Sequence, residues 1–395
     1  MATSRDLLLS AAVLIAVALL SFGEIGQLRP FVDPVVDTWP ALGPGEASIL
    51  FAGDNLLGDA SLHWMKKKGD DWQFRRIESL LTTADAAAIV VNQEGPVTTH
   101  NKRNRPNTVY NYKQPPRTMA LFASKGITHM SLANNHALDR EWAGLKDTIK
   151  HARAAGITVF GGGASAAEAR KPVVIDVGGT RVAIVGAADN WGSLRRAGWE
   201  AKGKQGGLFL MRDELLEPAT RAARKEADLV VWYPHWGDNY APIRRSQRRL
   251  AEKLVAAGAD AIVGHHSHEA QSFGWVGGKP VAWSLGNLVF GTPGRFGDDK
   301  YGEGWGLVMR MVIRDGAIDR FEFVPMQINN RINDYQPHPL TASRSREVLR
   351  MFAQREGTPL RLVDGVGVLD AKPPTTPLRH AAVDSDEPED EDSSD

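Results

Sequence analysis

The chain of 395 residues contains no cysteine. Disulfides, thiolate metal sites and a zinc ribbon are therefore excluded, although the compartment is not fixed by this absence. Net charge is also absent, because 47 basic residues balance 47 acidic ones. Residues 381–395 hold eight of those acids and no Lys or Arg, so the rest of the chain carries 47 bases against 39 acids, or +8. That excess favours an anionic substrate or polymer. The chain shows no recognised nucleic-acid-binding motif, so nucleic acid is not an expected partner.

An apolar run of full membrane-spanning length is missing as well. Leu7–Phe22 has sixteen residues, which as a helix reach about 24 Å against a hydrocarbon core of roughly 30 Å. Arg5 precedes this run, and Ser21-Phe22-Gly23 forms a poor cleavage site. We expect residues 1–23 to be a single-pass anchor in the cell membrane; a cleaved signal peptide and a buried core helix are the alternatives. Either kind of export places the remaining chain on the extracytoplasmic side, or releases it as a secreted protein.

The remaining chain divides by composition. Residues 24–46 hold four prolines and are expected to form a linker. A main domain is expected at 47–330 and a C-terminal extension at 331–370. An acidic tail at 371–395 buries too little apolar surface to become ordered. Strand–helix alternation followed by late antiparallel strands predicts an α/β fold of two packed mixed sheets, with one helix expected at Asp71–Thr83.

Two imidazoles one residue apart are the most informative motif. His266 and His268 follow the apolar run Ala261–Val263. If this segment stays extended, both side chains point to the same side and can converge on one cation or one pair of cations. Neutral imidazole is the commonest metal ligand in proteins, and α/β proteins place ligands in the turn after a buried strand.

Other strand-like runs end on metal-capable side chains in the same way, namely on Asp54, Glu94, Asn135 with His136, and His235. Since the carboxyl ends of strands in an open sheet share one edge, these residues and the histidine pair are expected to meet in one crevice. Each alone has an ordinary interpretation, such as a helix cap or turn for Asp54. Carboxylate, amide oxygen and imidazole together predict a hydrolytic centre for Mn, Fe or Zn. Two such cations about 3.5–4 Å apart need a bridging carboxylate, for which Glu94 is the candidate.

These motifs lie in unbroken order and resemble those of the CapA family of poly-γ-glutamate capsule-synthesis proteins, which look like members of the calcineurin-like metallophosphoesterase superfamily. The resembling segments are Phe51–Leu57, Val91–Thr98, Gly126–Asp139, His235–Gly237, Ile262–His268 and Ser284–Phe290. The resemblance implies a four-layer αββα sandwich with a metal centre at one end of its two sheets. It implies two divalent cations as cofactors.

By position, the resemblance assigns a role to each candidate residue. The implied metal ligands are Asp54, Glu94 as the bridging carboxylate, Asn135, His235, His266 on the second metal and His268 on the first. Leu56 stands where the superfamily's DxH motif would place a histidine. His136 directly follows a ligand and is expected to protonate the leaving group; orienting a ligand is the alternative. Lys102, Arg103 and Arg105 lie in a polar loop and are weaker candidates for binding an anionic chain.

Three functional hypotheses stay open at this point. The first is a membrane-tethered protein for the synthesis or export of an anionic envelope polymer, poly-γ-glutamate, working beside other polymer-synthase subunits. The second is a free-standing metal-dependent phosphoesterase, and the third is a non-catalytic scaffold of a polymer synthase. Whether the metal site is catalytic is left open by the sequence.

Overall fold

The computed structural model describes residues 33–105, 107–296, 302 and 304–374. The chain divides into two units, Met1–Pro34 and Val35–Asp395, and the elements named here belong to the second. The expected anchor at residues 1–23 and the acidic tail from residue 375 onward lie outside the described residues. Among the helices of the described part, none has both the length and the apolar character needed to cross a bilayer.

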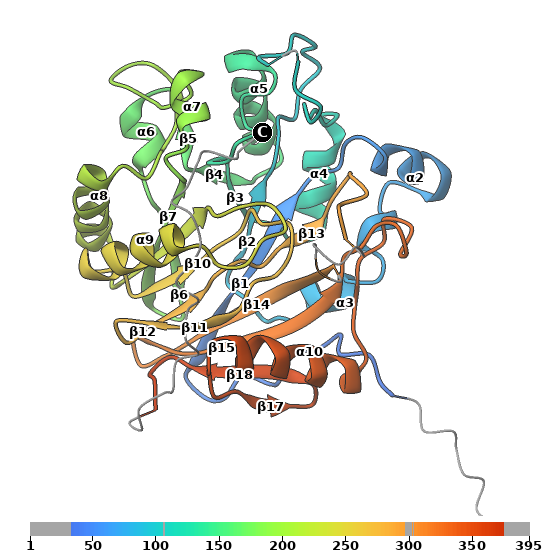
Figure 1. The fold of residues 1–395 in the computed structure, drawn as a ribbon, viewed down its shortest axis with the longest axis vertical. Coiled ribbons are helices and arrows are strands. Elements are labelled where there is room, and N and C mark those ends of the chain that lie inside the picture. Colours follow the sequence, from blue (N-terminus) through green and yellow to red (C-terminus); the bar gives the residue numbers. More distant parts are fainter. Residues whose placement is uncertain (1–32, 106, 297–301, 303, 375–395) are drawn as a thin grey trace, which may run out of the picture. The chain divides into compact units, whose positions relative to one another are not determined.

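The larger of two mixed sheets has ten strands (Figure 1). Its order is β17-β18-β15-β14-β1-β2-β3-β4, with β13 paired to β1 and β16 to β15. Strands β1 to β4 run parallel, whereas β14, β15 and β18 are antiparallel to their neighbours. The bounds are β1 Glu46–Asn55, β2 Ile89–Gln93, β3 His129–Ser131, β4 Thr158–Phe160, β13 Asn287–Val289, β14 Trp305–Arg314, β15 Ala317–Gln327, β16 His338–Pro339, β17 Arg361–Val363 and β18 Val366–Asp370.

The smaller sheet has six strands in the order β11-β12-β10-β9-β7-β6. Its inner strands β12, β10, β9 and β7 run parallel, and hairpins add β6 and β11 at the edges. The bounds are β6 Val173–Val177, β7 Thr180–Ala188, β9 Leu229–His235, β10 Ala261–Val263, β11 Phe273–Val276 and β12 Lys279–Ala282, with β5 Gly162–Gly163 and β8 Gly207–Leu208 forming a separate pair.

The two sheets pack face to face through side chains that alternate along each strand. In β1, Ile49 and Phe51 enter one core, whereas Leu50 and Ala52 enter another on the opposite face, as the two-residue period of a strand requires. The first core also contains Tyr233 of β9, whose ring centroid lies 5.9 Å from that of Phe51. Burying an aromatic side chain of this size contributes about 1.5–3 kcal/mol.

Helices cover the outer face of each sheet, which completes four layers (Figure 1). On the larger sheet, α2 (Ser61–Lys68), α3 (Glu78–Thr82) and α4 (Arg117–Ser124) share a core with β1 and β2. On the smaller sheet, α8 (Asp213–Glu226) and α9 (Arg245–Ala256) pack on β7 and β9. The predicted αββα sandwich of two mixed sheets is confirmed. The other helices are α5 Glu141–Ala154, α6 Ala166–Arg170, α7 Gly192–Arg196 and α10 Ala342–Arg355.

One predicted helix is wrong in part. The segment Asp71–Thr83 forms a 3-10 turn at Trp72–Phe74, and α3 begins only at Glu78. Tertiary contacts explain the break, because Trp72 donates its indole N–H to the carbonyl of Asp334 and stacks on Trp64 at 6.1 Å.

The segment 331–370 adds β16, α10, β17 and β18 to this fold. Strand β18 pairs along β15, with Leu369 opposite Phe321. Leu349 and Phe352 of α10 enter the core between the sheets. This part of the chain therefore completes the edge of the larger sheet.

Candidate metal centre

Parallel strands from both sheets end at the centre, and their last residues supply its side chains. Asp54 lies near the end of β1, Glu94 directly follows β2, and His235 is the last residue of β9. His266 and His268 follow β10. None of these five residues is more than 5% exposed, so the centre is removed from bulk water.

Asp54 faces two sides of this centre. Its Oδ1 lies 3.8 Å from Nδ1 of His235 and accepts a hydrogen bond of 2.8 Å from the amide of Asn92. Its Oδ2 lies 3.7 Å from Nδ1 of His268 and accepts the backbone N–H of His266 at 3.2 Å. The two carboxylate oxygens are thus shared between the histidines of two strands.

Glu94 closes one side of the centre. Its Oε1 lies 3.8 Å from Nε2 of His268 and 3.9 Å from Nε2 of His136, and it has no hydrogen-bond partner. Ligand-capable atoms of Asp54, Glu94 and His268 all lie within 4.8 Å of one another. This buried group has the composition of a site for a hard divalent cation.

His235 links the remaining predicted ligands. Its Nε2 lies 3.0 Å from Oδ1 of Asn135, and its ring centroid lies 4.4 Å from that of His266. Trp191 packs against His266, with ring centroids 4.8 Å apart. All six predicted ligands therefore lie around one point, while their role as ligands stays a prediction.

The segment is not extended at His266 and His268, so the condition under which both side chains would point to the same side of a strand is not met. Their φ angles are 108° and 58°, in the region that side chains other than glycine seldom adopt. Hydrogen bonds fix the turn. The N–H of Tyr240 donates to the carbonyl of Ser267 at 2.8 Å, and the hydroxyl of Ser267 donates to the hydroxyl of Ser284 at 2.9 Å. The two imidazoles reach the centre through this strained turn and not along a strand, and strain of this kind gathers at functional sites.

Burial controls the ionisation of the centre. It raises the pKa of Asp54 and raises the pKa of Glu94 well above its usual value, where the charge of Asp54 adds to the shift. Burial lowers the pKa of His235 and His266 well below the usual value, with neighbouring imidazoles adding to it, and lowers the pKa of His268 to about 4. Neutral imidazoles are ready to ligate metal, and buried carboxylates need a cation to ionise at low cost. This donor set, with Oε1 of Glu94 and Nδ1 of His266 lacking a partner, fits divalent cations.

His136 lies between this centre and solvent. Its Nδ1 is 2.7 Å from Oδ2 of Asp139, and its ring packs on Tyr112 at 4.2 Å. Nε2 faces Glu94. Asp139 was not predicted from the sequence, although its position three residues after His136 was a signal for such a partner. The geometry suits a residue that holds a proton at Nε2.

A cavity of about 760 Å³ opens over the centre and is lined by Asn135, His136, His266 and His268. Three arginines from separate loops also line it, namely Arg105, Arg295 and Arg331. Of the three predicted basic residues, only Arg105 reaches this cavity. Lys102 pairs instead with Glu141 at 2.8 Å and is 72% exposed, and Arg103 is exposed and does not line the cavity. Arg295 and Arg331 were missed, because their segments carry no motif.

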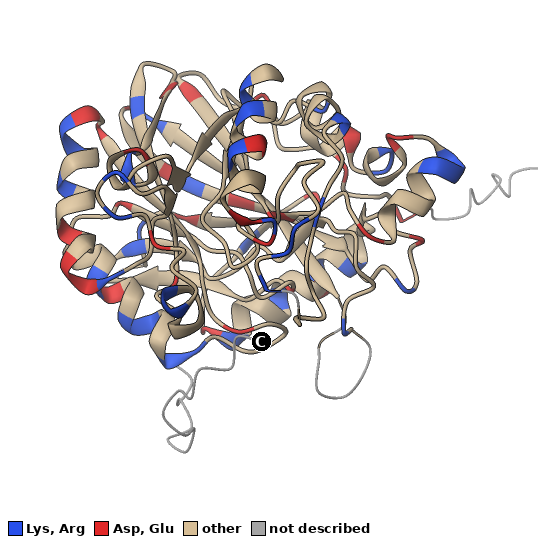
Figure 2. Ribbon diagram, turned by 90° about the horizontal axis from the view of Figure 1, so that it is seen from above, with Lys and Arg blue, Asp and Glu red and all other residues tan. Residues whose placement is uncertain are grey.

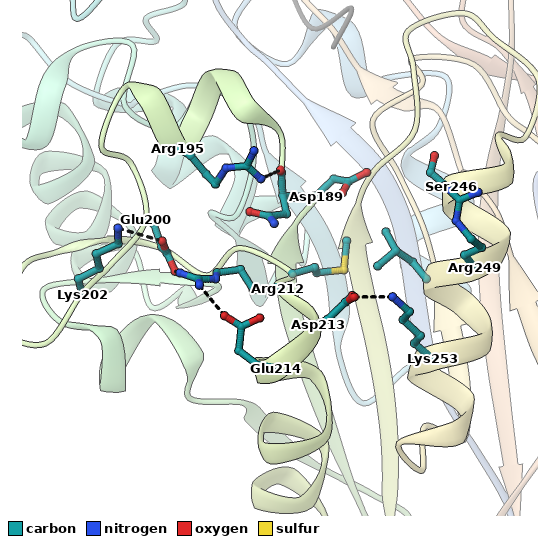
Figure 3. A pocket seen from close by; sticks show the side chains of 13 residues that line it. Asp189, Arg195, Glu200, Lys202, Arg212, Asp213, Glu214, Ser246, Arg249 and Lys253 are labelled. Atoms are coloured by element: carbon teal, nitrogen blue, oxygen red, sulfur yellow. Dashed lines mark hydrogen bonds and ion pairs between the residues drawn. The ribbon is translucent and has the colours of Figure 1, made fainter. Parts of the chain in front are cut away.

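A second cavity of about 580 Å³ lies between α8, α9 and the segment after β7 (Figure 3). Its five basic and four acidic side chains largely offset one another, with Lys202 paired to Glu200 and Lys253 to Asp213. None of the residues that line it is a histidine. It therefore offers no counterpart of the buried centre.

Comparison with known proteins gives consistent relatives. The family described as "Bacterial capsule synthesis protein PGA_cap" matches residues 48–292. The PGA biosynthesis protein CapA of Bacillus subtilis (strain 168) is 29% identical over 290 residues, which cover 71% of this chain and 72% of that protein. The capsule biosynthesis protein CapA of Bacillus anthracis is 31% identical over 308 residues, covering 75% and 70%.

Among solved structures, the calcineurin-like phosphoesterase YfkN from Bacillus subtilis is similar at 12% sequence identity and a TM-score of 0.42. The likeness covers 78% of this chain and 96% of that one. The fold is defined by the two mixed sheets themselves.

Proposed function

The chain belongs to the bacterial capsule synthesis protein family, and we propose that it acts as a metal-dependent hydrolase on the anionic capsule polymer, poly-γ-glutamate. The observation that carries the proposal is the cavity itself, in which three arginines stand above a buried group of carboxylates and imidazoles. The names of its relatives concern capsule and PGA biosynthesis.

Arginines suit this substrate because the polymer carries one carboxylate per residue. A guanidinium binds a carboxylate through two parallel hydrogen bonds. Arg105 is held in place, since it donates to the carbonyl of Asn135 at 2.9 Å, pairs with Oδ1 of Asp139 at 3.4 Å, and its guanidinium lies over the Trp199 ring at 4.7 Å. Basic and acidic residues alternate along the helices at one side of the molecule (Figure 2). The three cavity arginines outnumber the two carboxylates that also line the cavity, Asp59 and Asp238.

The residues that would hold the cations are Asp54, Glu94, Asn135, His235, His266 and His268. When bound, divalent cations generate a nucleophile from water at neutral pH and polarise the attacked carbonyl. The apolar side chains of Leu56, Tyr112 and Phe290 form a buried cluster beside the centre. Phe290 contacts His268 at 4.7 Å, so this wall restricts water on that side.

His136 would supply the proton for the leaving group. Its Nδ1–H donates to the Asp139 carboxylate at 2.7 Å, which fixes the ring with Nε2 facing Glu94 and the centre. The proton on Nε2 then passes to the γ-amide nitrogen as its bond to the carbonyl carbon breaks. The nucleophilic oxygen stays on the carbonyl carbon, which leaves one new carboxylate and one new amine.

Anchoring through residues 1–23, an extracytoplasmic position and contact with polymer-synthase subunits complete the proposal. The apolar run Leu7–Phe22 and the capsule relatives support these parts. A tethered hydrolase would meet the polymer as it leaves the cell.

The test incubates the full-length protein and Mn²⁺ with poly-γ-glutamate and measures polymer length and newly formed amines. A parallel reaction uses a bis-aryl phosphodiester. Shortening of the polymer that is lost in Glu94→Gln supports the proposal. Hydrolysis of the phosphodiester alone would contradict it and favour a phosphoesterase, because guanidinium groups also bind phosphate. Activity on neither substrate would favour a scaffold.

A further inference from the structure

His265 is a buried histidine outside the six predicted ligands. It is 0% exposed, and neither Nδ1 nor Nε2 has a hydrogen-bond partner. Buried polar atoms are almost always paired, and an exception needs a physical explanation, of which a bound ion is one. The ring stacks on Tyr233 with centroids 4.1 Å apart and meets His235 edge-on at 5.0 Å. These contacts hold the ring without using its nitrogens.

The backbone places His265 with little freedom. The residue before it is Gly264, where an added Cβ would come within 2.1 Å of the Trp283 carbonyl oxygen and 2.3 Å of Nε1 of Trp236. The N–H of His265 donates to the carbonyl of Pro234, and its own carbonyl accepts from Trp236, both at 3.1 Å. His265 and His235 therefore stand side by side on neighbouring strand ends.

The hydrogen bonding of His235 decides which of its nitrogens is available. Nε2 lies 3.0 Å from the amide oxygen of Asn135, an acceptor, so Nε2 carries the proton and donates. The lone pair of the neutral ring is then on Nδ1. That atom lies 3.8 Å from Oδ1 of Asp54 and 3.5 Å from the amide nitrogen of Asn92, which donates to it. Asn135 accordingly orients His235 as a hydrogen-bond acceptor.

From this arrangement we propose that Asp54, His235 and His265 form a cation site of their own, with a preference for Zn²⁺ or Fe²⁺. Their ligand-capable atoms all lie within 4.8 Å of one another, and all three residues are buried. Ligands of a tetrahedral zinc ion stand about 3.4 Å apart, so the group needs to close in by only on the order of 1 Å. Two imidazoles and one carboxylate are softer donors than the group of Asp54, Glu94 and His268, which suits Mn²⁺.

This inference deepens the proposed function, on which it rests for the second cation position, and it differs from the resemblance-based assignment in one respect. It makes His265 a ligand and Asn135 a residue that positions His235. The two assignments therefore predict opposite effects at these two residues. Removing a partner that only orients a ligand costs about 10–100-fold in metal affinity, so loss of a ligand must exceed that range.

The test measures Zn²⁺ affinity of the full-length protein by competition with a chromophoric chelator. His265→Ala and His265→Gln are compared with Asn135→Ala, and His129→Gln serves as a control outside the centre. We expect a loss of more than about 100-fold in both His265 variants and a smaller loss in Asn135→Ala. Zinc X-ray absorption should count two imidazoles in the wild type and one in His265→Gln, which also guards against a folding defect in the alanine variant.

Two outcomes would overturn the inference. One is Zn²⁺ binding that is unchanged in folded His265 variants, and the other is a greater loss in Asn135→Ala than in His265→Ala. Its failure can be told from that of the proposed function. If the protein binds Zn²⁺ through His265 but does not cleave the polymer, only the proposed hydrolase function is refuted. If it cleaves the polymer but has no Zn²⁺ site at His265, only the role of His265 is refuted.

Discussion

The Nδ1 of His136 lies 2.7 Å from the carboxylate of Asp139, and both side chains are nearly closed to solvent. The pair stands at the cavity wall beside the predicted ligands. The site therefore contains two kinds of histidine. His235 and His268 face the buried carboxylates and have lowered pKa values, whereas His136 is paired with a carboxylate of its own.

This separation predicts different defects for His136→Ala and His268→Ala. Loss of a proton donor should lower kcat for polymer hydrolysis about 10²–10⁴-fold while metal content stays unchanged. His268→Ala and Glu94→Ala should instead each lose at least one cation, because too few donors would remain. Elemental analysis and initial rates on the three variants check this. Equal metal loss in His136→Ala would make that residue a ligand.

Arg105 is expected to bind the polymer. Arg105→Ala should raise KM for poly-γ-glutamate by about tenfold or more, and the effect should shrink at high salt, where charge interactions are screened. Arg221→Ala serves as the control, because Arg221 is 63% exposed on α8 and pairs only with Glu217 one turn away. A KM that is the same in both variants would remove Arg105 from the substrate site.

His129 predicts a pH dependence of stability outside the metal centre. Burial lowers its pKa from 6.5 to about 4. Between pH 4 and 6.5 the unfolded chain therefore binds a proton at His129 that the folded protein does not bind. The stability that is present above pH 6.5 is lost as pH falls toward 4. His129→Gln should reduce this loss by about 1–3 kcal/mol. Urea unfolding at pH 7.5 and 4.5 gives the difference, and parallel pH profiles for the two proteins would contradict it.

The stability of the protein should depend on the charge balance within an ion pair that is buried in the larger sheet. Arg310 and Glu322 are each 1% exposed, and Nε of Arg310 donates to Glu322 at 2.7 Å. Glu322→Leu leaves an uncompensated buried guanidinium and should cost about 3–5 kcal/mol. Adding Arg310→Met should restore part of this loss. If the double variant has a lower denaturant midpoint than Glu322→Leu alone, the attraction within the ion pair exceeds the cost of burying its two charges.

The gathering of Asp54, Glu94 and His235 was predictable from the sequence because each ends a parallel strand, and the topology of such strands brings their carboxyl ends together. Side chains whose positions depend on loops were not predictable. Arg331 lines the cavity through tertiary contacts that no local pattern records.

The turn at His266–His268 shows the same limit at closer range. Spacing alone placed both imidazoles on one face of a strand, but hydrogen bonds from distant residues hold them in left-handed conformations. His265 was passed over for a related reason. In an extended segment it would point away from its neighbours, whereas backbone hydrogen bonds to Pro234 and Trp236 and stacking on Tyr233 place it beside Asp54 and His235.

Asp54 is common to both buried groups that can hold a cation, so metal binding by the full-length protein with and without this carboxylate is the most direct measurement. Equilibrium dialysis against Mn²⁺ and Zn²⁺ followed by elemental analysis should find about two cations per wild-type chain. Asp54→Asn preserves the size of the side chain and should bind fewer than one, while its circular dichroism matches the wild type. A wild-type protein that binds neither metal, or a variant that binds both as well as the wild type, would contradict a metal centre at these residues.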